Sequence, residues 1–280
     1  MKKKKVRFWT GLAVAAILFS SMGERSFASA LEGDVPEVQE ETSGMIEEAS
    51  EETNAEDEFA EMPEEEEIPL NNERESFAPK GTGTADDPYQ ITGVEDLELL
   101  QENEGKYYKL MADLDLSGAS YVPVDCFQGN FDGNNRTIYN LIVEDRDHAG
   151  LFGEIVSGAV VRNLTLQNVQ ITGKTTAGAV SGRCEGTIDN VTVAGGRITG
   201  IEDGSQSVGG VAGSVGVGGQ IVNCVSSAEV EGDEAGGIAG NISGGYIKEC
   251  YASGKVSGNS GMAMCGGIYG VLYPASDDQE

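Results

Sequence analysis

The residues that could carry chemistry are few and widely spaced in this sequence of 280 residues. His148 is the only histidine, so a zinc site with two histidine ligands is excluded by count. No G-x-S-x-G motif accompanies His148, and we expect it in a solvated corner. The glycine-rich run 213–219 lacks the Lys-Ser/Thr that completes a phosphate-binding loop. We therefore predict no catalytic, cofactor-binding or metal-binding residues, and no cofactor.

Carboxylates are the remaining candidates for chemistry, because glycosidases and polysaccharide lyases use acids, calcium or basic residues on one outer face. The candidates are Asp125, Asp132, Glu154, Asp189 and Glu249. Asp132 lies in the turn sequence FDGN. Asp189 and Glu249 occupy neighbouring positions in two repeats that are two coils apart, which at the strand spacing is roughly 9–10 Å and near an inverting separation. Lysine and arginine are sparse nearby, so we expect no enzyme.

A repeat positions these residues. Similar segments start at Ala149, Ala177, Val208, Ala235 and Cys265, at intervals of 28, 31, 27 and 30 residues. A near-constant period of this size is typical of a solenoid. Within each repeat, short alternating apolar segments are bounded by glycine, which favours strands over helices.

Four apolar columns recur from repeat to repeat and are expected to stack inside the solenoid. They are Ile138, Val161, Ile188, Ile221 and Ile247; Leu141, Leu164, Val191, Cys224 and Cys250; Ile171, Ile198, Val230 and Val256; and Ile155, Cys184, Val215, Ile242 and Leu272. We predict an all-β fold: a right-handed parallel β-helix of about 27–31 residues per coil, with a small N-terminal cap that contains a short helix.

An asparagine column supports this register: Asn140, Asn163, Asn190 and Asn223, followed by Glu249. Stacked amides can hydrogen-bond from one coil to the next, which favours a structural role over a sugar-binding stripe.

The five cysteines are Cys126, Cys184, Cys224, Cys250 and Cys265. Three of them replace aliphatic residues in the columns, as small core residues do. Cys224 and Cys250 would stack in adjacent coils at about 5 Å, within the Cα range of a disulfide. Because their side chains would run parallel in one column, we favour free thiols over a disulfide.

Composition divides the chain into five segments. Residues 1–30 have the basic start, apolar run and small-x-small end of a secretory signal peptide, with a retained membrane anchor as the alternative. Residues 31–80 hold 19 acidic and two basic residues and are predicted to form a disordered stalk, with calcium buffering as the alternative. A cap at 81–126, repeats at 127–272 and a polar tail at 273–280 follow.

Charge narrows the classes of partner. The formal net charge is −29, and without the predicted signal peptide 12 basic and 46 acidic residues give −34. Such a charge repels phosphate backbones and anionic lipids, so we predict no nucleic-acid partner and no membrane contact after cleavage.

The repeats VGGVAG…GGQIVNCVSSAEVEG and AGGIAG…GGYIKECYASGKVSG resemble the GLUG motif of bacterial surface proteins. The resemblance covers residues 81–271, and the second repeat departs from it with Ala179 in place of a glycine. This motif occurs in adhesin-like proteins and in the non-catalytic region of IgA-specific metallopeptidases. The resemblance implies a surface β-helix, but the zinc motif of those peptidases is absent from this sequence.

These observations predict a secreted or cell-surface, non-enzymatic, adhesin-like module. The expected partners are a host glycoprotein, extracellular matrix or cell-wall polysaccharide. Two alternatives stay open: a carbohydrate-active β-helix enzyme, either a polysaccharide lyase or a glycosidase, and an accessory or truncated fragment of a larger surface protein. Fold alone does not choose among them.

Overall fold

The computed structural model describes residues 79–102, 104–201 and 206–273. All of them lie in one of the two units into which the chain divides. In chain order the elements are β1 (Tyr89–Ile91), the 3-10 helix η1 (Glu95–Gln101), β2 (Tyr107–Leu110), β3 (Leu114–Asp115), β4 (Val124–Phe127), β5 (Asn130–Tyr139), β6 (Ile142–Ala149), β7 (Phe152–Ile155), β8 (Val160–Gly178), β9 (Ser181–Cys184), β10 (Thr187–Gly200), β11 (Ser207–Gly209), β12 (Ala212–Val215), β13 (Gln220–Val222), β14 (Val225–Ser226), β15 (Glu229–Glu231), β16 (Glu234–Gly236), β17 (Ala239–Ser243), β18 (Tyr246–Lys248), β19 (Tyr251–Ala252), β20 (Val256–Ser257), β21 (Met264–Gly266) and β22 (Tyr269–Tyr273).

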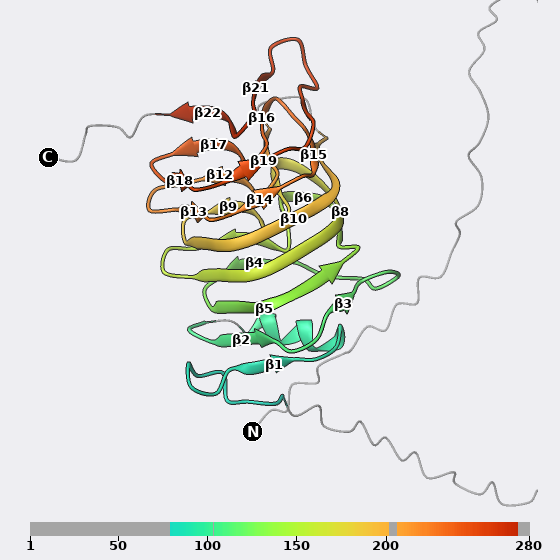
Figure 1. Cartoon of the computed structure of the whole chain (residues 1–280), viewed down its shortest axis with the longest axis vertical. Coiled ribbons are helices and arrows are strands. Elements are labelled where there is room, and N and C mark those ends of the chain that lie inside the picture. The colour runs from blue at the N-terminus through green and yellow to red at the C-terminus, as the bar shows by residue number, and fades with distance from the viewer. Residues whose placement is uncertain (1–78, 103, 202–205, 274–280) are drawn as a thin grey trace, which may run out of the picture. The chain divides into compact units, whose positions relative to one another are not determined.

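The strands stack as a parallel β-solenoid of about six turns (Figure 1). The larger sheet runs in the order β1-β2-β5-β8-β10-β13-β18, with shorter strands paired beside this path, and the smaller sheet runs β22-β17-β12-β9-β7-β4. Every recorded pair is parallel, as it must be when each coil lies directly on the previous one. The prediction of an all-β parallel β-helix with one short helix near the N-terminal end is confirmed.

The repeat starts stack as predicted. Ala149 pairs with Ala177, Ala177 with Val208, Val208 with Ala235, and Ala235 with Cys265. Small residues fit this column because all but the last are fully buried.

The aliphatic columns also stack. Ile188 pairs with Val161 on one side and with Ile221 on the other, and Ile221 pairs with Ile247. The column from Ile155 to Leu272 is paired through every intervening coil. Like side chains therefore pile up at the strand spacing of about 4.8 Å and exclude water from the interior.

The first coils add aromatic rings to the aliphatic side chains of this interior. Phe127 stacks on Phe152 with ring centroids 4.3 Å apart, and Phe131 meets Phe152 edge-on at 5.9 Å. Tyr108 continues the series at 6.3 Å from Phe127, and its hydroxyl donates to the carbonyl oxygens of Leu99 and Glu102. Burial raises the pKa of this hydroxyl well above its usual value.

The asparagine column marks a corner of each coil. Asn163, Asn190, Asn223 and Glu249 all have φ between 54° and 56°. Asparagine tolerates this left-handed conformation better than most residues, which explains why it recurs there. The Asn190 amide donates to Oδ1 of Asn163 at 2.9 Å, as a stacked ladder should.

The predicted columns are wrong in the first coil. Phe131, not Ile138, pairs with Val161, while Ile138 pairs with Leu166. The cause is an irregularity in β5, where the step from residue 132 to 136 faces only the step from 162 to 164 in β8. The sequence between these steps, GNN, contains two asparagines with positive φ, and such insertions are typical of β-bulges.

The same shift moves Asn140 and Leu141 out of their predicted columns. Asn140 lies in a second corner column, where the amide of Asn168 donates to its Oδ1 at 2.7 Å. The Leu141 carbonyl accepts the Gln170 amide, so Leu141 lies beside Val169 and not beside Leu164.

The predicted cap, residues 81–126, carries η1, strands β1 to β3 and most of β4, and β1 and β2 already belong to the larger parallel sheet. The predicted signal peptide lies outside the described residues, as do the stalk before residue 79 and the tail after residue 273. No helix in residues 79–102, 104–201 or 206–273 is long and apolar enough to cross a membrane.

Candidate functional site

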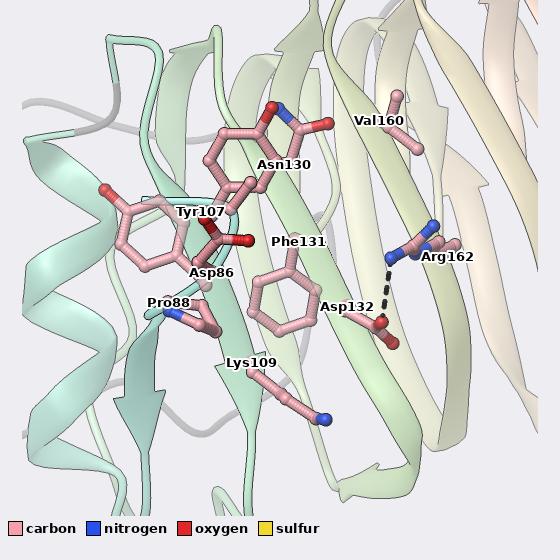
Figure 2. Close-up of a pocket in the computed structure, with 11 residues that line it drawn as sticks. Asp86, Pro88, Tyr107, Lys109, Asn130, Phe131, Asp132, Val160 and Arg162 are labelled. Atoms are coloured by element: carbon pink, nitrogen blue, oxygen red, sulfur yellow. Dashed lines mark ion pairs between the residues drawn. The ribbon is translucent and has the colours of Figure 1, made fainter. Parts of the chain in front are cut away.

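The outer face of the larger sheet is hollowed near its N-terminal edge. We call this cavity of about 350 Å³ the N-terminal groove. Its polar lining comes from six side chains: Asp86, Tyr107, Lys109, Asn130, Asp132 and Arg162. They lie on the loop before β1 and on three successive strands of the sheet, β2, β5 and β8 (Figure 2).

The first row across the groove is Tyr107, Asn130 and Val160, which pair across β2, β5 and β8. The next residues along two of these strands, Tyr108 and Phe131, are buried. Successive side chains on a strand point to opposite faces, so burial of these two fixes the row on the outside.

The second row is Lys109, Asp132 and Arg162, and it continues on β10 with Asp189. Charges of alternating sign therefore follow one another at the strand spacing of about 4.8 Å. Figure 2 shows the three residues that line the groove in this order across the strands.

Asp132 is held by its neighbours. Its carboxylate accepts hydrogen bonds from the Asn134 backbone amide at 2.9 Å and from the Asn163 side chain at 3.1 Å, and Arg162 lies 3.1 Å away as an ion pair (Figure 2). Partial burial favours the neutral acid, but these partners outweigh burial, and the pKa of Asp132 falls below its usual value. Asp132 is therefore a poor proton donor near neutral pH.

Three groove side chains are free to meet a ligand. Tyr107, Lys109 and Asp86 have no side-chain hydrogen bond or ion pair to any residue that the structure describes. The Tyr107 side chain lies on the surface, with the residue 36% exposed. A flat aromatic ring beside unpaired polar groups is typical of a binding site.

A second hollow, of about 440 Å³, gathers three more of the residues predicted from sequence. His148 lies at the end of β6, and its Nδ1 is 2.8 Å from the Thr176 hydroxyl. Its Nε2 is 3.5 Å from Glu154. Asp125 borders the same hollow and pairs with Arg146 at 3.5 Å. We call these residues the histidine cluster.

The histidine cluster also contains Cys126, whose Sγ is 3.9 Å from Glu154. Partial burial, with the nearby charges of Glu154 and Asp125, raises the pKa of the Cys126 thiol. The thiolate is the nucleophilic form, so this environment opposes a nucleophilic role for Cys126. Arg183 also lies 3.8 Å from Glu154, so this carboxylate already has a cationic partner.

The remaining two predicted acids do not face each other. Asp189 shares its row with Val222 and Lys248, and it accepts a hydrogen bond from the Asn223 amide at 2.8 Å. Glu249 lies one position beyond that row and pairs with Lys248 at 3.4 Å. Asp189 and Glu249 therefore lie in neighbouring positions two coils apart, as the repeats predict, but they do not share a row. Asp189 instead shares its row with Asp132, and Arg162 lies between them.

Within residues 79–102, 104–201 and 206–273, no group of three or more histidine, cysteine, aspartate or glutamate side chains could hold a metal ion. The five cysteines are recorded as free thiols. The Cys224 backbone amide lies 3.4 Å from the Cys250 sulfur, as expected for residues stacked in neighbouring coils.

The sequence-based prediction missed Tyr107, Lys109 and Arg162. Tyr107 and Lys109 lie before the recognisable repeats. Arg162 was missed because the alignment placed Ile138, and not Phe131, beside Val161. With Phe131 aligned to Val161, the following residues Asp132 and Arg162 align as well, so the signal was present in the register.

Comparison with known proteins supports this reading of the repeats. Residues 95–195 match the family model for the M26 IgA1-specific metallo-endopeptidase N-terminal region. Halomucin of Haloquadratum walsbyi is 35% identical over 155 residues, which are 49% of this chain and 2% of halomucin. The chain thus spans a small part of that relative's length.

Among solved structures, a putative immunoglobulin A1 protease from Bacteroides ovatus matches with a TM-score of 0.60 and 26% identity, over 69% of this chain and 64% of that protein. The sequence match and the structural match agree, and the predicted resemblance is confirmed. Over residues 95–195 the chain is similar to the N-terminal region of IgA1-specific metallo-endopeptidases, and its solenoid is consistent with a GLUG-type surface β-helix.

Proposed function

We propose that this protein is a secreted or surface-associated, non-enzymatic binding module that presents the outer face of its larger sheet to a partner. The observation that carries the proposal is the N-terminal groove, where Tyr107, Lys109 and Asp86 remain without side-chain partners among the described residues. Rigid parallel strands on one sheet hold most of this surface, so little conformational entropy is lost when a ligand binds.

The state of the carboxylates argues against catalysis. Glycoside hydrolysis needs one carboxyl group that donates a proton and a second that acts as base or nucleophile. Asp132 has a lowered pKa, and Arg162 separates it from Asp189 in their shared row. Glu154, in the histidine cluster, lies near His148 and Arg183. These carboxylates are arranged as structural partners.

The predicted signal peptide and acidic stalk supply the context of the proposal, since they would export the solenoid and hold it away from its point of attachment. The partners we propose are a host glycoprotein, extracellular matrix or cell-wall polysaccharide. A net charge of −29 disfavours nucleic acid and anionic membranes.

An array of glycoproteins, matrix proteins and polysaccharides, probed with the purified protein, tests this function. We expect saturable binding to at least one class and no release of reducing ends or unsaturated sugars from the bound polysaccharides. Failure to bind any array member, together with turnover of a polysaccharide, would replace the binding module by the carbohydrate-active enzyme.

A further inference from the structure

We infer that the N-terminal groove binds an uncharged sugar residue of a polysaccharide, with Tyr107 under the sugar ring and the charged side chains on its hydroxyls. This inference rests on the proposed binding function and names the ligand class for it. It depends on three features of the groove: its charge balance, its aromatic side chain and its size.

The charges of the groove cancel. Lys109 and Arg162 are positive and Asp86 and Asp132 negative, in a protein whose net charge is −29. A site for an anion would concentrate cations, and a site for a cation would concentrate acids. A balanced set selects neither, but it offers both donors and acceptors to a ligand that needs both.

Sugar hydroxyls need both hydrogen-bond donors and hydrogen-bond acceptors. Each hydroxyl donates one hydrogen bond and accepts others. The Lys109 ammonium and the Asn130 amide can donate, and the Asp86 carboxylate can accept. Hydrogen bonds to charged groups are stronger than those between neutral groups, so a neutral polyol gains from such a lining without carrying a charge itself.

Tyr107 supplies the apolar half of the site. Its exposed ring lies next to Asn130 in the first row, and Asp86 lines the same groove (Figure 2). Aromatic side chains bury a large apolar area while leaving a polar tip in water. A sugar ring, with one apolar face and polar edges, matches a flat ring bordered by hydrogen-bonding groups.

The size of the groove agrees with this ligand. Its volume of about 350 Å³ is at the small end of ligand pockets, which span about 300–1,000 Å³. A pocket of this size suits a small ligand such as one sugar residue, and the rest of a polysaccharide would run over the outer face of the sheet.

The solenoid supplies matched controls, because the two rows of the groove continue to the last coil. Tyr246 lies in the row of Tyr107, and Lys248 lies in the row of Lys109. Each control therefore has the same residue type in an equivalent position, five coils beyond its counterpart in the groove. All four side chains lie on the outer face, so substitutions there should leave the fold intact.

The test measures binding of the purified protein to neutral oligosaccharides, uronate oligosaccharides and the proteins of the array at 50 and 300 mM salt. We expect the tightest carbohydrate binding with a neutral oligosaccharide and less than a twofold change with salt, because an uncharged ligand is not screened. Tyr107→Ala should weaken this binding at least tenfold and Lys109→Met about threefold to tenfold, whereas Tyr246→Ala and Lys248→Met should leave it within twofold.

The experiment distinguishes failure of the neutral-sugar assignment from failure of the proposed binding function. Tighter binding of uronates, with a steep loss at high salt, would overturn the neutral-sugar assignment and leave the binding function. So would a ligand whose affinity falls equally in the groove variants and in their controls, or a protein ligand that all four variants bind as the wild type does. If the unmodified protein binds nothing on the array, both the assignment and the proposed function are wrong.

Discussion

The first coils and the last coil follow the same repeat pattern but differ in what covers them. Ile155 and Leu272 belong to one column, yet Ile155 is fully buried and Leu272 is 56% exposed. Ala149 and Cys265 share another column and differ in the same way. The sequence pattern sets which residues align, but a residue is buried only where a neighbouring coil lies on it.

The outer face differs between the same two regions. Tyr107 and Tyr246 share a row, but the Tyr246 hydroxyl donates to Oε1 of Gln220 at 2.7 Å, while the Tyr107 hydroxyl has no partner among the described residues. Lys248 forms an ion pair with Glu249, whereas Lys109 forms none with any residue that the structure describes. Within the described residues, the first coils therefore leave unpaired the side chains whose counterparts in the last coil have hydrogen-bond or ion-pair partners.

The largest effect should come from truncating one column in both regions. Ile155→Ala deletes a fully buried side chain next to Phe127 and should reduce the free energy of unfolding by about 2–5 kcal/mol. Leu272→Ala removes a half-exposed side chain and should cost less than about 1 kcal/mol. Denaturant unfolding, followed by circular dichroism, measures both.

Ile155→Val is the graded control for this pair, with an expected cost of about 0.5–1.5 kcal/mol. Equal losses for Ile155→Ala and Leu272→Ala would mean that Leu272 is covered in solution, and the contrast between the two regions would disappear.

A glycine column provides the next test. A Cβ on Gly237 would lie 2.3 Å from the Gly267 carbonyl oxygen of the next coil, whereas a Cβ on Gly267 would meet no described atom within 4 Å. Gly237→Ala should therefore cost about 1–3 kcal/mol through overpacking. Gly267→Ala should change the stability by less than about 0.5 kcal/mol.

Melting temperatures of the two alanine variants, compared with wild type, measure this difference. A large loss in Gly267→Ala would indicate a further layer on the last coil, and an unchanged Gly237→Ala would contradict the close coil spacing.

Repetition explains why most of the fold was predictable. A column such as Ile188, Ile221 and Ile247 is tested by every repeat, so a single unusual residue does not hide it. The coil that contains β5 has an insertion that no other coil repeats, so the other repeats do not help to align it. There the GNN insertion moved the alignment, and Asn140 and Ile138 were assigned to the wrong columns.

The candidate site was less predictable for a related reason. Asp132 was identified but explained by its turn, because its partner Arg162 follows only from the corrected register. Tyr107 precedes the repeats, and its exposure depends on strand pairing that no local pattern reveals. The polar residues of the N-terminal groove do not recur in every coil, and periodicity reports only what the repeats share.

The pH dependence of stability should separate the two regions further. Because the folded-state pKa of Asp132 is lowered, its carboxylate stabilises the protein above its unfolded pKa of about 4, and this contribution is lost as the pH falls through the folded value. Asp132→Asn should cost about 1–2 kcal/mol at pH 7. The gap to wild type should shrink as the pH falls below about 4 and close once the pH is below the lowered folded-state pKa.

Unfolding curves at pH 7, 5 and 3 measure this gap. Val222→Asn, at the equivalent row position near the C-terminal end, is the control whose effect should stay constant with pH. A gap for Asp132→Asn that does not change with pH would show that the lost stability has another origin than the charge.

The smallest expected effect is a gain in stability from a substitution in the last coil. Glu249 adopts φ of 56° in a corner where the preceding coils have asparagine, and most side chains are strained in this conformation. Glu249→Asn should relieve part of that strain and stabilise the protein by about 0.5 kcal/mol, since the exposed ion pair with Lys248 that it removes contributes little. The reverse change, Asn190→Glu, should destabilise the protein by more, because it also removes the hydrogen bond to Asn163.

Hydrogen exchange of the β18 amides is the sensitive measurement for Glu249→Asn, because a terminal coil opens locally before the whole solenoid unfolds. Faster exchange in Glu249→Asn would mean that the ion pair, not the corner geometry, determines the residue at this position.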